Sequence, residues 1–206
     1  DPGPLTTVQD AGRVGYAAQG YRSCGAADGY AYRLGNVLVG NDPGAAVLEC
    51  TLRGAALRFE TDTVFALTGA ESPAALDSTP VPYYAPLLAK AGSVLQMGAA
   101  KTGLRSYLAV GGGIATPPVL GSRATDVKCG IGGLEGRKLA AGDTLAIGSC
   151  DTPALWQAIT AKRLDRPLRD KTVCGGLHPM RVQGTQMLPL LRAVPGPQDA
   201  AFTVQG

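Results

Sequence analysis

The chain has few of the side chains from which metal centres, disulfide frameworks and hydrolytic triads are built. Its 206 residues include one histidine, His178, so a cluster of histidine metal ligands within the chain is excluded. The five cysteines are odd in number, widely spaced and without a Cys-x-x-Cys pair, which indicates neither a disulfide framework nor a zinc site. We therefore expect no metal centre, and we interpret His178 as a surface or structural residue.

Long apolar runs and clusters of one charge are also missing. No apolar run approaches the roughly 18 residues that a membrane span needs, and no charged-then-apolar signal segment opens the sequence. Residues 151–206 carry seven basic and four acidic side chains, which leaves residues 1–150 without net charge. No basic run is interleaved with aromatic residues. These absences predict a cytoplasmic protein that binds neither membranes nor nucleic acid.

Glycine and proline, by contrast, are abundant. The chain has 29 glycines and 15 prolines, with 45% hydrophobic and 17% charged residues. Because they are scattered between short apolar runs, they indicate many turns that join many short strands. Runs rich in β-branched or aromatic residues predict strands at 46–50, 55–60, 63–68, 74–76, 94–97, 104–110 and 144–147. Such a series is typical of a β-barrel or a β-sandwich.

One helix is clearly predicted, between residues 27 and 38. Four apolar residues share one face at helical period: Ala27, Ala31, Leu34 and Leu38. Asp28 stands near the start, where a carboxylate favours the positive end of the helix dipole. Gly40 is a natural left-handed cap for the other end.

The remaining segments have weaker patterns. Residues 153–163 are compatible with a second short helix, whereas the prolines of residues 83–91 argue against a central strand there. Residues 165–189 are expected to be irregular, and residues 190–194 to begin a new strand.

Residues 111–143 are densest in glycine and contain most of the polar residues suited to act on a ligand. There is no Gly-x-x-x-x-Gly-Lys-Ser/Thr motif, so the usual phosphate-cradling loop is missing. Residues 130–136 resemble a dinucleotide fingerprint, but no strand-to-helix crossover surrounds them. A dinucleotide-binding domain is therefore not indicated.

Gly121 precedes a compact group of polar residues, Ser122, Arg123, Thr125 and Asp126. If this segment begins a short helix, its free backbone N–H groups and Arg123 would together bind a carboxylate or a phosphate. Alternatively it is a capped turn, in which Ser122 and Asp126 bond backbone groups and Arg123 pairs with Asp126. The pattern alone leaves both interpretations open.

Several polar residues nearer the start of the chain are similarly ambiguous. A corner made flexible by Gly12 contains Gln9, Asp10 and Arg13. These residues would either order a ligand or an adjacent loop, or Asp10 and Arg13 would form a structural ion pair. Asp28 is either a helix-start residue or a carboxylate of the site.

Two charged residues lie inside predicted strands. Glu49 belongs to an apolar strand and is expected to face solvent or to pair with a basic neighbour. Arg105 stands between Leu104 and Ser106, before Tyr107, so we expect it on the face of the sheet opposite the core.

A series of motifs runs through the chain in a fixed order. The first is Pro-Gly-Pro-Leu-Thr-Thr-Val-Gln-Asp-Ala-Gly-Arg at residues 2–13. Others cover nearly the whole chain, at residues 24–28, 36–41, 48–51, 67–70, 107–110, 119–125, 132–137, 142–143 and 195–198. Taken in order, these motifs resemble the KipA/AHS2 family, labelled variously as allophanate hydrolase subunit 2, biotin-dependent carboxyltransferase and the C subunit of 5-oxoprolinase. Four residues depart from the family pattern: Val14, Cys24, Ala27 and Ser78.

The resemblance implies a mainly β fold, with a cyclophilin-like β-barrel and one or two short helices in residues 1–150. Residues 151–189 would form a connector, and residues 190–206 would be the start of a second, truncated barrel. A site formed between the barrels, or with a partner subunit, would therefore be incomplete in this chain.

The resemblance also implies an enzyme subunit that acts with a KipI/AHS1-type partner, so that the isolated chain would be inactive. One implied activity is the ATP-dependent opening of 5-oxoproline to glutamate, together with a third, lactam-handling subunit. The other is carboxyl transfer from carboxybiotin to urea or a related amide. A regulatory protein that acts on a kinase through its partner is the third possibility. We favour the 5-oxoprolinase, because a subunit without a biotin-carrier segment fits a separate-subunit system.

Both enzyme activities must activate a poorly reactive amide, whose carbonyl oxygen gains negative charge. We predict Arg123, Ser122 and Asp10 as catalytic residues. The residues expected to bind the substrate are Gln9, Arg13, Asp28, Thr125, Arg105 and Arg137. This prediction requires the two glycine-flanked polar segments, residues 9–13 and 121–137, to converge at one edge of the barrel.

Overall fold

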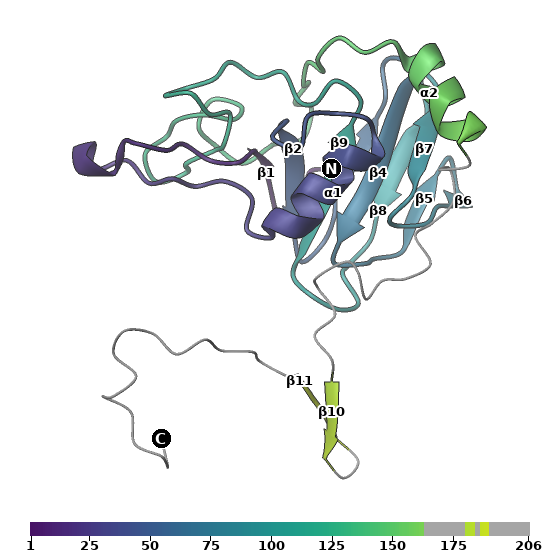
Figure 1. Cartoon of the computed structure of the whole chain (residues 1–206), viewed down its shortest axis with the longest axis horizontal. Helices are drawn as coiled ribbons and strands as arrows, with labels where there is room; N and C mark the ends of the chain where they lie inside the picture. The colour runs from purple at the N-terminus through teal and green to yellow at the C-terminus, as the bar shows by residue number, and fades with distance from the viewer. Residues whose placement is uncertain (163–179, 184–185, 190–206) are drawn as a thin grey trace. The chain divides into compact units, whose positions relative to one another are not determined.

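The structure, a computed structural model, describes residues 1–162, 180–183 and 186–189 (Figure 1). The chain divides into two compact units, residues 1–169 and 170–206. In the second unit, β10 (Met180–Gln183) pairs antiparallel with β11 (Gln186–Pro189). These two strands correct the expectation of irregular structure for that part of residues 165–189. His178 and the predicted strand at residues 190–194 lie outside the described residues, and the assignment of a connector and a second barrel stays a prediction.

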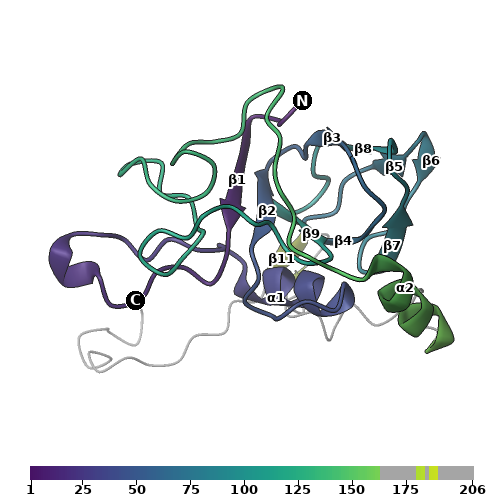
Figure 2. The ribbon, with the colours of Figure 1, turned by 90° about the horizontal axis from the view of Figure 1, so that it is seen from above.

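Two antiparallel sheets form the framework of the first unit (Figures 1 and 2). The larger sheet contains, in spatial order, β1 (Leu5–Gln9), β2 (Val47–Thr51), β9 (Arg105–Val110), β4 (Thr63–Gly69) and β7 (Pro86–Ala89). The smaller sheet contains β3 (Ala56–Arg58), β8 (Val94–Met97), β5 (Ala74–Leu76) and β6 (Thr79–Pro80). The mainly β fold is confirmed.

The main core lies between these two sheets. Because side chains alternate along a strand, Leu108 points into the core while its neighbour Tyr107 faces the other side of the sheet. Leu108 packs in one cluster with Phe65 and Leu67 of the larger sheet and Leu95 of the smaller sheet, all at most 1% exposed. The two sheets therefore share one apolar interior.

Most strand predictions are confirmed within one or two residues, but the one at 144–147 is wrong. Of that segment, Ile147 alone makes an isolated bridge, to Ile114. The opposing chain turns at Gly112 and Gly113, whose φ angles are +84° and +71°, so a ladder cannot continue. The proline-containing segment 83–91 provides β7, which begins at Pro86 on the edge of the larger sheet, where a proline is tolerated.

The predicted helix forms as α1 (Gly29–Leu38), which packs on the outer face of the larger sheet (Figure 2). Asp28 is its N-cap, and its carboxylate accepts hydrogen bonds from the backbone N–H groups of Tyr30 (3.1 Å) and Ala31 (3.0 Å). At the other end Gly40, with φ of +71°, donates its N–H to the carbonyl of Val37. Asp28 therefore acts as a helix-start residue.

The second helix is α2 (Thr152–Ala161), which confirms the short helix expected near residues 153–163. Asp151 caps its start, and Ile159 is buried against the cluster between α1 and the sheet. A third helical segment, the 3-10 helix η1 (Ala17–Gln19), lies in a loop that projects from the sheets. None of the helices in the described part is long and apolar enough to cross a membrane.

Asn36 joins α1 to the loop that follows it. It is fully buried, and its Nδ2 donates a hydrogen bond to the carbonyl of Ala45 (2.8 Å). Its Oδ1 accepts one from Nδ2 of Asn41 (3.0 Å), which also donates to the carbonyl of Val110 in β9 (2.8 Å). One side chain thus fixes the helix relative to the sheet.

We expect Asn36→Ala to lower the free energy of unfolding by about 1–3 kcal/mol, because it leaves buried polar groups without partners. Urea denaturation measures this change. Val37→Ala is the matched control. Val37 is next to Asn36 in the sequence and is 56% exposed, so its truncation should change the free energy of unfolding by at most about 0.5 kcal/mol. Equal losses in the two variants would contradict the role of Asn36.

Candidate functional site

Asp10, directly after β1, joins the two polar segments identified in the sequence. Its Oδ1 accepts hydrogen bonds from Gly12 N (2.8 Å) and from Ser122 Oγ (2.7 Å). Its Oδ2 accepts one from the backbone N–H of Arg123 (2.5 Å). The residue is only 8% exposed, and hydrogen bonds to a buried carboxylate are strong. This carboxylate therefore fixes the backbone at Ser122 and Arg123; we call this set of contacts the Asp10 clasp.

Further hydrogen bonds connect the same two segments. Thr125 donates to the carbonyl of Val8 through both its N–H and its Oγ1, each at 2.9 Å. Gln9 Nε2 donates to the carbonyl of Thr125 (3.3 Å), and Arg13 Nη2 donates to the carbonyl of Ala124 (2.6 Å). The predicted convergence of residues 9–13 with the polar segment after Gly121 is confirmed.

The glycine-rich loop at residues 130–136 packs directly on the segment that contains Ala124 and Thr125. A Cβ atom on Gly132 would lie 2.1 Å from the carbonyl oxygen of Ala124. A Cβ atom on Gly133 would lie 1.9 Å from Thr125 Oγ1. Both distances are far below van der Waals contact, so the close approach of these two segments requires glycine at both positions.

Residues 119–126 do not begin a helix. Val119 and Ser122 form an antiparallel bridge that closes a tight turn, with positive φ at Leu120 (+52°) and Gly121 (+75°). The prediction that this segment begins a helix is therefore wrong. The alternative prediction of a turn, in which Ser122 bonds a backbone group, is confirmed. Ser122 Oγ accepts the backbone N–H of Ala124 (3.0 Å) while it donates to Asp10.

Asp126 belongs to the same region but has an unexpected partner. Its buried Oδ1 accepts the backbone N–H groups of Lys128 (3.0 Å) and Cys129 (3.2 Å). It also forms an ion pair of 2.8 Å with Nη2 of Arg22, from the projecting loop. The Arg22 guanidinium, with these backbone N–H groups, holds the pKa of the Asp126 carboxyl far below its usual range.

Two expected ion pairs are consequently wrong. Arg123 does not pair with Asp126; its Nε donates instead to the carbonyl of Thr116 (2.7 Å). Among the described residues Arg13 forms no ion pair with Asp10, because the three donors of the clasp occupy that carboxylate.

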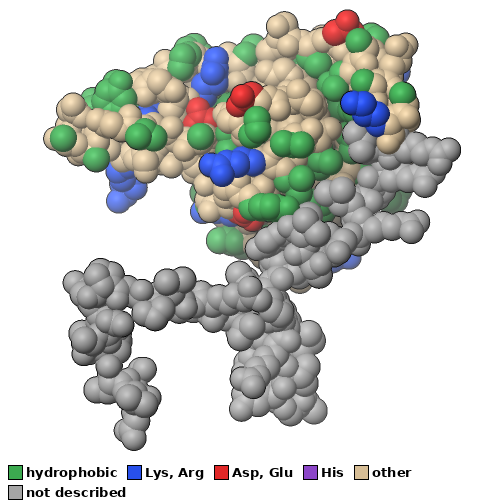
Figure 3. All heavy atoms as spheres, viewed as in Figure 1, with side chains coloured by type: hydrophobic (Ala, Val, Ile, Leu, Met, Phe, Trp, Pro, Cys, Tyr) green, Lys and Arg blue, Asp and Glu red, His purple; other side chains and the backbone are tan. Residues whose placement is uncertain are grey.

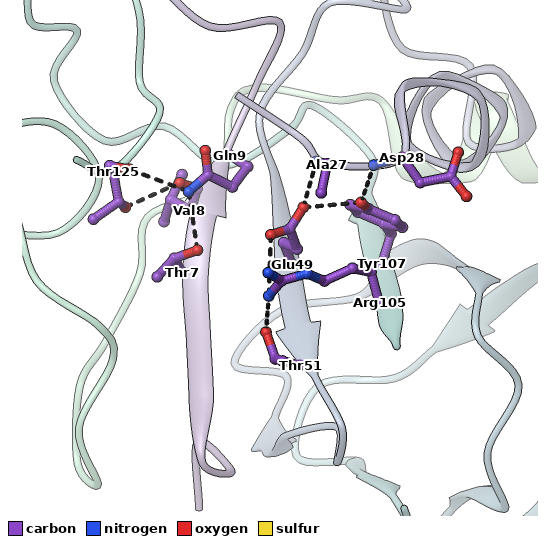
Figure 4. Close-up of polar contacts among 10 residues, drawn as sticks. All are labelled: Thr7, Val8, Gln9, Ala27, Asp28, Glu49, Thr51, Arg105, Tyr107 and Thr125. Atoms are coloured by element: carbon purple, nitrogen blue, oxygen red, sulfur yellow. Dashed lines mark hydrogen bonds and ion pairs between the residues drawn. The ribbon is translucent and has the colours of Figure 1, made fainter. Parts of the chain in front are cut away.

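A second polar group lies on neighbouring strands of the larger sheet, beside the start of α1 (Figure 4). Glu49 Oε2 accepts hydrogen bonds from the Tyr107 hydroxyl and from Ala27 N, both at 2.8 Å. The Tyr107 oxygen in turn accepts the N–H of Asp28 (2.7 Å). Burial, with the nearby carboxylates, raises the pKa of Tyr107.

Arg105 completes this group on β9. Its Nη1 lies 3.7 Å from Glu49 Oε1 and donates a hydrogen bond to Thr51 Oγ1. Glu49 therefore pairs with a basic neighbour instead of facing solvent, and Arg105 lies on the face opposite the main core, as expected. Glu49 and Tyr107 are residues that the predicted site had not included, although an acid inside an apolar strand was a usable signal.

The structure thus distributes the predicted site residues over three places. The Asp10 clasp and its surroundings contain Gln9, Asp10, Arg13, Ser122, Arg123 and Thr125. Asp28 and Arg105 belong to the second group, on the face of the sheet. Arg137 lies apart, bound through two nitrogens to Asp143 at 2.7 and 3.0 Å and paired with Glu135 at 3.1 Å.

Buried polar atoms without a partner gather around the clasp. In the described residues, six buried side-chain atoms have no hydrogen-bond partner: Gln9 Oε1, Arg13 Nε and Nη1, Tyr32 Oη, Thr116 Oγ1 and Asp126 Oδ2. Five of these six lie in residues 9–13 and 116–126. Because buried polar groups in native proteins nearly always have partners, this concentration indicates a place that a ligand, water or another protein completes. No group of side chains suited to hold a metal ion occurs in the described part of the chain.

Comparison with known proteins gives one family. The carboxyltransferase domain family, subdomain A and B, matches residues 19–206. The C subunit of 5-oxoprolinase from Escherichia coli (strain K12) is 53% identical over 146 residues, which cover 71% of this chain and 47% of that protein. The corresponding protein of Haemophilus influenzae is 44% identical over 139 residues, 68% of this chain and 45% of that protein. The chain thus spans about half the length of these curated relatives.

Urea-processing enzymes are also similar. The urea amidolyase of Saccharomyces cerevisiae is 41% identical over 149 residues, which cover 72% of this chain and 8% of that protein. The crystal structure of the Kluyveromyces lactis urea amidolyase matches with a TM-score of 0.70 and 39% identity, over 75% of this chain and 9% of that one. The crystal structure of TTHA0988 matches with a TM-score of 0.70 and 32% identity, over 96% of this chain and 65% of that one.

The Arg137–Asp143 pair gives a pH prediction. The Arg137 guanidinium beside Asp143 lowers the pKa of that carboxyl from 3.8 to about 2. The stability that this pair contributes is therefore present above the ordinary pKa and is lost as the pH falls towards 2. A ¹³C NMR titration should place the midpoint of Asp143 near pH 2, and Arg137→Gln should move it back towards 3.8. A wild-type midpoint already near 3.8 would contradict the pairing.

Proposed function

Because the chain belongs to the carboxyltransferase domain family, subdomain A and B, we propose that it is part of a subunit of an ATP-dependent 5-oxoprolinase, which converts 5-oxoproline to glutamate. Its similarity to the C subunits of two 5-oxoprolinases supports this choice. The complex would contain a KipI/AHS1-type partner and a third, lactam-handling subunit, and it would work in the cytoplasm. ATP would be bound with the partner subunits.

The observation that carries this proposal is the concentration of unpartnered buried atoms around the Asp10 clasp. A folding core would satisfy these groups internally, whereas a site that awaits substrate or another subunit would not. The isolated chain would accordingly be inactive, because its buried polar groups would lack the substrate or the partner subunit that completes the site.

In this proposal Arg123 stabilises the negative charge that develops on the amide oxygen. Its backbone is held by Asp10 and its Nε by the carbonyl of Thr116. Among the described residues its two terminal nitrogens have no hydrogen-bond partner, and the side chain is half-buried. A guanidinium that is fixed at one edge and free at the other is preorganised to receive developing charge.

Ser122 and Asp10 act through Arg123. The Ser122 hydroxyl already donates to Asp10 and accepts from Ala124 N, and the residue is 1% exposed. Gln9, Arg13 and Thr125 would line the substrate near the clasp, and Arg105 and Arg137 would contribute from farther away. Asp28 caps α1 and is left out of the proposed site.

A second candidate function is carboxyl transfer in a biotin-dependent urea or amide carboxylase. The observations that favour it are the description of the matched family and the 41% identity with a yeast urea amidolyase. Carboxybiotin would then replace ATP as the cofactor that reaches the site. The same Arg123 would stabilise the charged oxygen of the transferred carboxyl group, so the two functions differ in substrate and not in the residues used.

Reconstitution of the longer protein with its partner subunits tests the role of Arg123. We expect Arg123→Ala to slow the turnover of ATP that depends on 5-oxoproline by about 100-fold or more, because a positioned charge donor is lost. Arg123→Lys should recover part of that loss. Arg58→Ala is the control, because its side chain is 63% exposed on the smaller sheet, and it should retain wild-type turnover.

The wild-type complex separates the candidate functions. Biotin-dependent carboxylation of urea in place of ATP-coupled lactam opening would establish the second candidate. Binding to the partner without either turnover would indicate a regulatory protein that acts on a kinase through that partner. Wild-type turnover in Arg123→Ala would remove Arg123 from the site.

A further inference from the structure

Arg13 is a buried cation without a carboxylate partner in the described part of the chain. It is 2% exposed, and the single hydrogen bond of its side chain runs from Nη2 to the carbonyl of Ala124 (2.6 Å). Its Nε and Nη1 have no hydrogen-bond partner among the described residues. Taking a charge out of water is costly, so buried charges are normally paired, and this guanidinium therefore lacks an anion.

A hollow of about 530 Å³ lies within the projecting loop that carries η1, and Arg13 is one of the residues that line it. It is lined by Arg13 and Arg22, with Val14, Ala17 and Tyr21 as its apolar part, and none of the residues that line it is acidic. Figure 3 shows separate apolar side chains among polar atoms on the projecting loops, with Lys or Arg side chains nearby. Two cations and apolar walls suit a small organic anion better than a fully hydrated inorganic ion.

Arg22 lines the same hollow and pairs with the buried carboxylate of Asp126 at 2.8 Å, while its own side chain is 53% exposed. The free nitrogens of Arg13 are buried, so binding of an anion to them requires side chains of this loop to move.

We propose that Arg13 anchors the carboxylate of a small organic acid in this hollow. This inference rests on the proposed function and deepens it, because 5-oxoproline carries a carboxylate next to its lactam, whereas urea does not. The free Nε and Nη1 groups of the guanidinium can each donate a charge-assisted hydrogen bond to a carboxylate oxygen. The site would thus select acids over neutral amides of the same shape.

The matched pair of probes is 5-oxoproline and 2-pyrrolidinone, which is the same lactam ring without the carboxylate. In an NMR titration of the ¹⁵N-labelled full chain, 5-oxoproline should shift the Nε–H signal of Arg13, and 2-pyrrolidinone should leave it in place. Calorimetry should show 5-oxoproline binding at least about tenfold more tightly than 2-pyrrolidinone. Arg13→Gln should abolish this preference, and Arg58→Gln should preserve it.

The wild-type titration keeps the test decisive if Arg13→Gln fails to fold. An Arg13 signal unmoved by 5-oxoproline, or moved equally by both probes, would overturn the proposal. A signal that moves only on addition of the partner subunit would also overturn it, because the anion would then be a protein carboxylate.

Turnover distinguishes this inference from the proposed function. If 5-oxoproline shifts Arg13 while the reconstituted complex shows no 5-oxoproline-dependent ATP hydrolysis, the anion site stands and the proposed function fails. If the complex turns over normally while Arg13 is unaffected by 5-oxoproline, the proposed function stands and the anion site fails.

Discussion

The carboxylate of Asp10 holds the segment after β1 against Ser122 and Arg123, which lie 112 and 113 residues further along the chain. Between β9 and α2 the chain contains no helix or strand, so no paired strand positions these loops. Their geometry depends on backbone hydrogen bonds to β1, such as that from Thr125 N–H to the carbonyl of Val8, and on buried side-chain contacts with the segment after β1. The close approach of the glycine-rich loop to Ala124 and Thr125 adds a steric constraint, which side chains larger than hydrogen would break.

This constraint also bears on the residues proposed for the site. A clasp made by a buried carboxylate fixes the backbone of Arg123, while the two terminal nitrogens of its side chain have no hydrogen-bond partner among the described residues. Arg13 is held beside the clasp by the carbonyl of Ala124, and no acidic side chain in the described part of the chain pairs with it. Buried polar atoms without hydrogen-bond partners are typical of a subunit whose site is completed by a substrate or another protein.

Local features of the fold could be predicted from the sequence, because their signals are local. Asp28 and Gly40 bracket α1 as caps, and runs rich in β-branched or aromatic residues located β2, β4 and β9. The segment at residues 144–147 has the composition of a strand, but its would-be partner turns away at two glycines with positive φ. Composition does not report whether a pairing partner is present.

The contacts of charged residues in the site were the hardest to predict. The sequence places Arg13 near Asp10 and Arg123 near Asp126, and both short-range pairings are wrong. The actual partner of Asp126 is Arg22, 104 residues away, and that of Glu49 is Arg105 on another strand. Charge attraction has no sequence period, so the fold alone decides which side chains meet. The convergence of the two glycine-flanked segments was predicted from the family resemblance and not from any pairing rule.

Amide hydrogen exchange at Arg123 tests most directly whether Asp10 holds the site together. The N–H of Arg123 is bonded to Asp10 alone, so it should be protected in the wild type and exchange at least about tenfold faster in Asp10→Ala. Amides of β9, such as that of Leu108, should remain protected in both proteins, which shows that the sheets are intact. Unchanged exchange at Arg123 in a folded Asp10→Ala variant would contradict the account.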